Sequence, residues 1–254
     1  MTVAVVRALS VSLLALGMMM SPATAGVGSE DAMVRAPRAG AAVAPTPATG
    51  PVRIAPVNSN PHRKSYAQWA ADWWQWALET SAADSPLIDA TGAKCKVGQR
   101  GYVWFLAGSP SPDYTVRNCE VPAGSALFFP LLNNFYGATK SDPANQKTEA
   151  FCRAQVESTI NAANTLVFRV DGVAMTGLKQ QAVRSVLFDV QLPPDNIFGL
   201  VSADPSVRLV SPSCDAGYYV FLSPLPPGWH TLRWWTRRAD GSIGQDILYR
   251  LHVR

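Results

Sequence analysis

The pattern of apolar and polar positions is most regular near the C-terminus, where two stretches alternate strictly enough to predict β-strands. These strands are residues 229–236 and 247–253, and between them Asp240-Gly241 fits a two-residue type I′ turn. The turn chemistry and the alternation independently select the same pairing of the two strands. The predicted core-facing pairs are Trp234–Ile247, Leu232–Tyr249 and His230–Leu251, and the predicted outer pairs are Trp235–Asp246, Arg233–Leu248 and Trp229–His252.

Earlier apolar runs that end in turn residues predict further β-strands. Residues 166–170 run into Asp171-Gly172, a hairpin-turn signal, and residues 186–192 stop at Pro193-Pro194. The other predicted strands are residues 102–107, 126–132 and 218–222. Short strands separated by proline-rich turns are typical of an antiparallel β-sandwich or a jelly-roll-like domain.

A helical period precedes these strands. Ser65-Tyr66-Ala67-Gln68 fits a capping box, so a helix should begin at Tyr66 and run to about Glu79. Around its axis a narrow polar stripe is formed by Gln68, Asp72, Gln75 and Glu79, and most of the remaining surface carries Trp69, Trp73, Trp74, Trp76 and Leu78. Such a helix is expected to be wedged against the sheets. Its tryptophans are interpreted as core residues, with a stacking platform for sugars as the alternative.

A second helix is predicted from about Thr148 to Ala163. Along it Cys152, Val156 and Ile160 recur on one face at helical spacing. Together the patterns predict a mainly β (α+β) fold with a tryptophan-rich N-terminal helix and one further helix.

The N-terminal residues have a different composition. Residues 1–25 combine Arg7, an apolar run over residues 8–20 and the small residues Ala23-Thr24-Ala25, which is typical of a secretory signal peptide cleaved near Ala25. A membrane anchor is the alternative, but the run is short for a bilayer about 30 Å thick, and no later segment is long and apolar enough to span one.

Residues 26–61 are rich in Ala and Pro and predict a disordered linker, which leaves residues 62–254 as a single domain.

The four cysteines all lie in the predicted domain, and their even number indicates two disulfides in an oxidising compartment. Of the three possible pairings we favour Cys95–Cys119 with Cys152–Cys214, because the first pair brackets one predicted strand. A four-cysteine zinc site is the alternative, but the chain has no Cys-x-x-Cys spacing. The protein is therefore expected to be secreted or periplasmic, and no metal or cofactor is expected.

Charge and motifs narrow the range of functions. The net charge is +4 and the basic residues are scattered, which argues against nucleic-acid binding. The sequence has no Gly-x-Ser-x-Gly elbow, no His-Glu-x-x-His motif and no phosphate-binding glycine loop. Its aspartates, among them Asp195 and Asp215, mostly stand beside Pro, Gly or Asn and are interpreted as turn residues.

Three side chains are the weak candidates for catalysis. The predicted register places His230 and His252 on opposite faces of the hairpin, so His230 is interpreted as a hydrogen-bonded structural residue, with catalysis as the alternative. Asp72 and Glu79 could form an acid/base pair in a cleft, although two helical turns separate them by about 10.5 Å along the axis.

Several motifs resemble a family of uncharacterised bacterial secreted proteins. They are the Trp69/Trp73/Trp76 helix, Gly101-Tyr102-Val103-Trp104-Phe105-Leu106-Ala107-Gly108, Cys119 with Val121-Pro122-Ala123-Gly124, Phe128-Phe129-Pro130, Leu192-Pro193-Pro194-Asp195-Asn196, Gly217-Tyr218-Tyr219 and Pro227-Gly228-Trp229-His230-Thr231. The resemblance covers roughly residues 65–236. It implies no activity and no catalytic residues, and it only favours treating this stretch as one unit.

The expected function is therefore that of an exported binding or surface-interaction protein rather than an enzyme. Trp229, Trp235, Arg233 and Arg237 are predicted to form its contact surface on the outer face of the C-terminal hairpin. A polysaccharide or a cell-envelope component is the expected partner. A secreted polymer hydrolase that uses Asp72 and Glu79 is the alternative.

Overall fold

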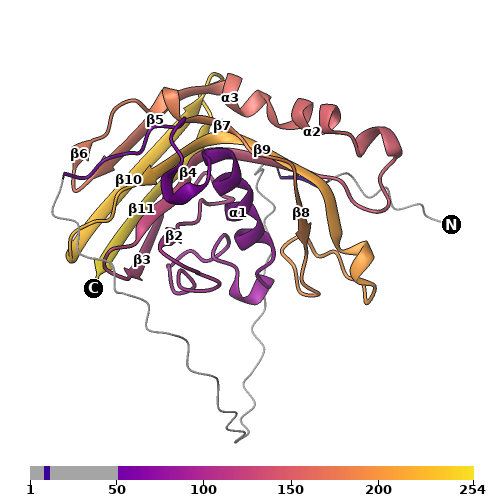
Figure 1. The fold of residues 1–254 in the computed structure, drawn as a ribbon, viewed down its shortest axis with the longest axis horizontal. Coiled ribbons are helices and arrows are strands. Elements are labelled where there is room, and N and C mark those ends of the chain that lie inside the picture. The colour runs from indigo at the N-terminus through magenta and orange to yellow at the C-terminus, as the bar shows by residue number, and fades with distance from the viewer. Residues whose placement is uncertain (1–8, 12–50) are drawn as a thin grey trace, which may run out of the picture.

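The structure is a computed structural model and describes residues 9–11 and 51–254. These residues form a sheet around β10 and β11, a sheet around β4 and β9, and a helix, α1, packed on the second sheet (Figure 1). The strands are β1 (Leu9–Val11), β2 (Val103–Phe105), β3 (Thr115–Val121), β4 (Ala126–Gly137), β5 (Ala163–Val170), β6 (Val173–Ala174), β7 (Ala182–Arg184), β8 (Phe188–Gln191), β9 (Leu209–Leu222), β10 (Gly228–Arg238) and β11 (Ile243–Val253). The helices are α1 (Tyr66–Leu78), α2 (Glu149–Val156) and α3 (Ser158–Ala162), with short 3-10 helices at Pro61–Arg63, Ala82–Asp84, Ala144–Gln146, Leu178–Gln181 and Pro205–Val207.

The mainly β fold with two sheets confirms the predicted fold class. In the β4–β9 sheet, β1 and β2 pair with β4, whereas β7 and β8 pair with β9. The β10–β11 sheet has the order β3-β11-β10-β5-β6. Most neighbouring strands are antiparallel, as predicted for a sandwich. However, β2 runs parallel to β4 and β3 runs parallel to β11, so the sheets are mixed.

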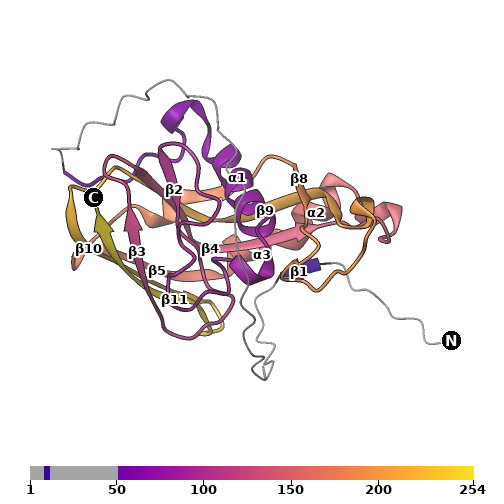
Figure 2. The ribbon, with the colours of Figure 1, turned by 90° about the horizontal axis from the view of Figure 1, so that it is seen from below.

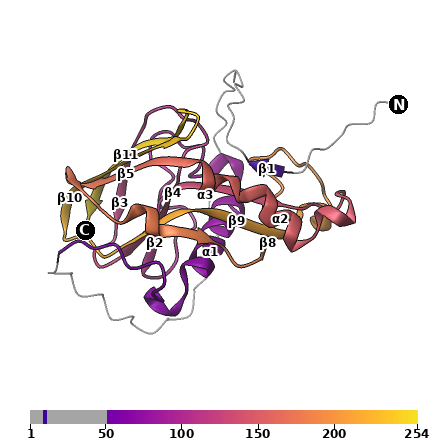
Figure 3. The same cartoon turned by 90° about the horizontal axis from the view of Figure 1, so that it is seen from above.

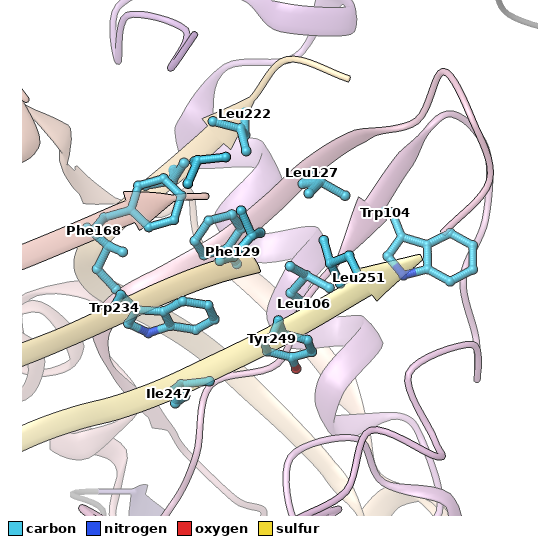
Figure 4. Close-up of a cluster of buried hydrophobic side chains, with 14 of the residues drawn as sticks. Trp104, Leu106, Leu127, Phe129, Phe168, Leu222, Trp234, Ile247, Tyr249 and Leu251 are labelled. Atoms are coloured by element: carbon cyan, nitrogen blue, oxygen red, sulfur yellow. The ribbon is translucent and has the colours of Figure 1, made fainter. Parts of the chain in front are cut away.

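The larger hydrophobic core lies between the two sheets. Trp234 of β10 stacks on Phe129 of β4 with 5.0 Å between ring centroids, and Tyr249 of β11 stacks on Trp234 at 5.6 Å (Figure 4). Phe168 of β5 meets Phe129 edge-on. All four rings are almost fully buried, and burying each stabilises the fold by roughly 1.5–3 kcal/mol. This core fixes which side of β10 and β11 faces inward and which side is left outside.

Helix α1 covers the opposite face of the β4–β9 sheet (Figure 2). Its predicted capping box is present, since Gln68 N donates to Ser65 Oγ and Ser65 N donates to Gln68 Oε1. Trp73 and Trp74 are almost fully buried against the sheet. Each of the four indole nitrogens of α1 donates a hydrogen bond; the acceptors are Pro61 O for Trp69, Leu106 O for Trp73, Asp215 Oδ1 for Trp74 and Val97 O for Trp76. The tryptophans are therefore core residues, not a stacking platform.

The second predicted helix is divided in two. Helix α2 has Thr148 as its N-cap and ends at Val156, and α3 follows directly. The β4 and β9 strands extend beyond the β10–β11 sheet, and α2 covers them there (Figure 3). The disulfide Cys152–Cys214 joins α2 to β9 at this place, where both sulfurs are buried.

Both predicted disulfides are confirmed. Besides Cys152–Cys214, the bond Cys95–Cys119 joins the loop before β2 to strand β3. Disulfides of this kind persist in oxidising, extracytoplasmic compartments. In the part of the chain that the structure describes, no helix is long and apolar enough to cross a membrane.

The C-terminal hairpin has the predicted register but a different turn. All six predicted residue pairs, from Trp229–His252 to Trp235–Asp246, are present. The turn has three central residues, because Gly241 N donates to Arg238 O, Arg238 pairs with Ser242, and only Gly241 has a positive φ. A three-residue loop alone would shift the pairing by one residue. A bulge opposite Thr236 inserts Gly244 and restores the predicted register.

The last part of the predicted linker is not disordered. Residues 51–60 lie along β9, where Ile54 pairs with Leu222 and Ala55 N donates to Phe221 O at 2.8 Å. This segment is ordered because Val52, Ile54 and Val57, which stand between the prolines, pack against the two cores. Its Ala- and Pro-rich composition gave no indication of these contacts. Residues 51–61 therefore belong to the packed domain, which the sequence had placed from His62 onward.

The rest of the linker and nearly all of the predicted signal peptide, with the cleavage site near Ala25, lie outside the described residues. Of the signal peptide the structure describes only Leu9–Val11. This segment forms β1 and pairs antiparallel with Phe135–Gly137 at the end of β4.

Candidate ligand-binding face

The side of the β10–β11 sheet that faces away from the core is accessible to solvent. Along β10 and β11, buried residues alternate with accessible ones. We call the accessible side the outer face; its residues are Tyr114, Val116, Asn118, Glu120, Val167, Arg169, Trp229, Thr231, Arg233, Trp235, Arg237, Asp246, Leu248, Arg250 and His252. The four residues predicted as a contact surface all lie on it. Their side chains, however, are held in two different ways.

Trp229 is the most exposed aromatic side chain of the outer face. Its relative exposure is 71 %, and its ring stacks on the imidazole of His252 with 4.5 Å between centroids and an interplanar angle of 8°. The register places these two residues directly opposite each other on β10 and β11. His252 therefore supports the indole from one side, so that contact with a ligand costs little further side-chain ordering.

Arg233 is held in the middle of the outer face by its neighbours. Its guanidinium carbon lies 4.8 Å from the ring centroid of Tyr114 and 5.2 Å from that of Trp235, a cation–π arrangement with two rings. It also forms an ion pair with Asp246, and its Nη1 donates to Trp234 O at 2.7 Å. Arg233 therefore orders Tyr114 and Trp235 and has little capacity left for a ligand.

Arg237 stands at the end of β10 near the hairpin turn. Its side chain is exposed, and its Nη1 donates one hydrogen bond, to Gly241 O at 3.3 Å. The predicted contact surface therefore consists of a supported stack, formed by Arg233 and Trp235, and two residues open to solvent, Trp229 and Arg237. Sequence alternation identified the side of the strands and the Trp229–His252 pair, but not Tyr114, which comes from the loop before β3.

His230 lies near the start of β10, and both of its ring nitrogens have hydrogen-bond partners. Nδ1 is 2.7 Å from Asp171 Oδ2 and Nε2 is 2.9 Å from Pro226 O, and the side chain is 13 % exposed. Partial burial opposes ionisation of Asp171, but hydrogen bonds from His230 and Thr231 N lower the pKa of its carboxyl group. This arrangement is that of the predicted structural histidine, which fastens the β5–β6 turn to the start of β10. His252 lies on the opposite side of the hairpin, as predicted.

The two candidate carboxylates of α1 each have a partner of their own. Asp72 forms an ion pair with Lys64, and Glu79 Oε1 accepts a hydrogen bond from Gln191 N at 3.2 Å. Between them on the polar stripe, Gln75 Nε2 donates to Asp189 O. These contacts attach the polar edge of α1 to its own N-terminal turn and to β8. They do not bring the two carboxylates to a common point.

One carboxyl group is buried within a strand, although the sequence predicts a turn residue there. Asp215 was interpreted as a turn residue, but it lies within β9 and is fully buried, with Trp74 Nε1 donating to its Oδ1 at 2.7 Å. Burial raises the pKa of Asp215 to about 8, against the opposing effect of the Trp74 hydrogen bond. Nearby Tyr219 is equally buried and accepts a hydrogen bond from Asn133 Nδ2. The only sequence signal was the apolar run of β9 that follows Asp215. Enclosed in the α1 interface, these groups have no solvent contact through which to meet a polymer.

Within residues 9–11 and 51–254, no cluster of three His, Cys, Asp or Glu side chains could hold a metal ion. Comparison of the chain with protein-family models, curated proteins and solved structures finds no match. The outer face is therefore interpreted on its own geometry.

Proposed function

We propose that this protein is an exported binding module that contacts a polysaccharide, of the cell envelope or outside the cell, through the outer face of its β10–β11 sheet. The observation that carries the proposal is Trp229, an indole that is 71 % exposed, supported by His252 and placed on an open sheet. Tryptophan is enriched at contact sites, because its ring offers a large apolar face together with a polar N–H group.

The chemistry of the outer face suits a sugar polymer. A sugar ring offers apolar C–H groups on its faces and hydroxyl groups around its edge. Trp and Tyr rings supply rigid, amphipathic contact area for such faces at a low cost in conformational entropy. Trp229 and Trp235 are six residues apart on β10, about 20 Å at 3.4 Å per residue, so the outer face is long enough for several sugar units.

Export is supported by two independent features. The N-terminal pattern around Arg7, residues 8–20 and Ala23-Thr24-Ala25 is typical of a signal peptide, and the two disulfides fit an oxidising compartment. The resemblance to bacterial secreted proteins agrees with this location.

Retention on insoluble polysaccharides and purified cell-wall material tests the proposal. We expect the protein to be retained on at least one of these polymers and Trp229→Ala to reduce retention strongly, because the substitution removes the open stacking surface without disturbing the core. Tyr102→Ala is the matched control, since Tyr102 is an aromatic residue, 48 % exposed, directly before β2 of the other sheet. Absence of retention on every polymer, or equal losses for the two variants, would contradict the proposal.

A further inference from the structure

The charge of the outer face indicates which class of polysaccharide it accepts. We infer that the ligand is an acidic polysaccharide that carries carboxylate groups, an inference that rests on the proposed binding function. Arginines outnumber carboxylates on this face, and its carboxylates are already neutralised. Asp246 pairs with Arg233, and Glu120 pairs with both Lys96 and Arg254.

Among the described residues, three arginines of the outer face are left without an anionic partner: Arg169, Arg250 and, at the hairpin turn, Arg237. The side chains of Arg169 on β5 and Arg250 on β11 are both exposed. Arg169 Nη1 donates to Gly172 O at 3.0 Å. A guanidinium group offers paired N–H donors that match a carboxylate in a bidentate geometry. Both side chains are therefore able to bind a carboxylate of a ligand.

The register adds a second, independent observation. Arg169 stands directly opposite Arg233 on the neighbouring strand. Like charges in directly opposed positions destabilise a sheet, and Asp246 compensates only Arg233. A carboxylate bound at Arg169 would relieve this repulsion, so the free protein carries a charge arrangement that an anionic ligand completes.

Arg250 lies close to the exposed indole. Trp229 pairs with His252, and the preceding outward position of β11 is Arg250, which places Trp229 and Arg250 in diagonal positions about 7–8 Å apart. A uronic acid ring stacked on Trp229 would bring its carboxylate within reach of the Arg250 side chain. One sugar unit thereby contacts both an aromatic ring and a guanidinium group.

The same features disfavour other polyanions and proteins. The core of a protein interface is apolar and depleted of charge, whereas Arg169, Arg233 and Arg250 stand among the aromatic and aliphatic side chains of the outer face. A nucleic-acid site requires a denser basic stripe than a chain of net charge +4 provides. Duplex DNA therefore serves as a competing ligand in the test.

Binding to matched charged and neutral polymers tests the inference. Polygalacturonate, alginate and hyaluronan supply the carboxylates, and fully methyl-esterified polygalacturonate supplies the same ring without charge. We expect the full-length protein to bind at least one uronate polymer about tenfold or more tightly than the methyl ester, because charged hydrogen bonds are lost. Raising the salt concentration should weaken this binding.

Single substitutions locate the charge effect. Arg250→Ala and Arg169→Ala should each weaken uronate binding by about tenfold and leave binding of the neutral ester unchanged. Arg100→Ala is the control, since Arg100 is an exposed arginine in the loop before β2. Thermal melting verifies that each variant is folded.

Three outcomes overturn the inference. In the first, the methyl ester binds as tightly as the acid while Trp229→Ala still abolishes binding. The proposed glycan-binding function would then be supported, and the preference for an acidic polysaccharide would be refuted. In the second, duplex DNA binds as tightly as the uronate polymers, which would show a general attraction for polyanions. In the third, no polysaccharide binds, charged or neutral, and the proposed function fails with the inference.

Discussion

At the scale of single residues, the carboxyl group of Asp215 couples the stability of the fold to pH. It is fully buried, accepts a hydrogen bond from Trp74, and has a pKa raised to about 8 by burial. The unfolded chain releases this proton near pH 4, whereas the folded chain keeps it to about pH 8. The stability that the proton contributes is therefore fully present below pH 4 and is lost as the pH rises from there through about 8.

Asp215→Asn should remove this dependence, because an amide of the same shape stays neutral at every pH. In denaturant unfolding with the disulfides intact, we expect the variant to be about as stable as the original protein at pH 3 and more stable by a few kcal/mol at pH 9. Asp72→Asn, which changes a surface ion pair, is the control and should shift stability by less than about 1 kcal/mol. A difference between Asp215→Asn and the original protein that stays constant from pH 3 to pH 9 would refute this account.

At the scale of elements, the C-terminal hairpin depends on two glycines for different reasons. Gly241 has a φ of +82° in the turn, with open space around it. Gly244 forms the bulge, where an added Cβ would lie 2.6 Å from Thr236 Oγ1 and 2.7 Å from Leu132 Cδ1, both on buried residues. Backbone strain alone acts at the first position, whereas steric overlap with the core acts at the second.

Alanine substitutions separate these two causes. Gly241→Ala should cost about 1 kcal/mol through its positive φ, and Gly244→Ala should cost more, about 1–3 kcal/mol, through overpacking. Gly172→Ala, at a φ of +80° in open space in the β5–β6 turn, should match Gly241→Ala. Denaturant unfolding measures all three, and a Gly244→Ala variant no less stable than Gly241→Ala would contradict the role assigned to the bulge.

The same hairpin shows what the sequence could and could not determine. The alternation of apolar side chains fixed the register, because a slip by one residue would expose Trp234 to solvent and bury Trp235. It could not reveal the three-residue turn, since the loop and the bulge at Gly244 change the residue count in opposite directions.

Strand β3 was not predicted, because its inward position 117 carries an arginine, which breaks the apolar pattern. Only the folded chain provides the carbonyl acceptors of Leu87, Asp89, Ala107 and Gly108 that satisfy Arg117.

The candidate site, too, could be predicted only in part from the sequence. Trp229, Arg233, Trp235 and Arg237 could be assigned to one face from the period of the strand alone. The sequence could not show which of these side chains are held by neighbours and which are open to solvent. Tyr114, which contacts Arg233, comes from the end of a loop, and β3 pairs with β11 in parallel across a long separation in the chain. Local patterns thus identify a face, whereas contacts distant in sequence decide which of its side chains are open.

At the scale of the whole molecule, the segment before α1 links the helix layer to the β4–β9 sheet. Tyr66 is almost fully buried, and its hydroxyl group donates to Ala55 O at 2.6 Å while accepting from Phe221 N at 3.2 Å. Residues 51–60 also close the edge of β9 through the Ile54–Leu222 pair. Removing this segment would leave the Tyr66 hydroxyl without its acceptor and expose apolar surface of both cores.

A comparison of shortened chains tests this boundary. A chain that begins at Pro51 is the reference, because it keeps every contact of the segment with β9 and lacks β1, as the shorter chain does. A chain that begins at His62 should be less stable by roughly 2–4 kcal/mol, since it loses the hydrogen bonds of this edge and the packing of Val52, Ile54 and Val57. Equal unfolding free energies for the two chains would show that the domain begins at the tryptophan helix. The outer face lies on the other sheet, so polymer binding by the chain beginning at His62 should persist wherever that chain is folded.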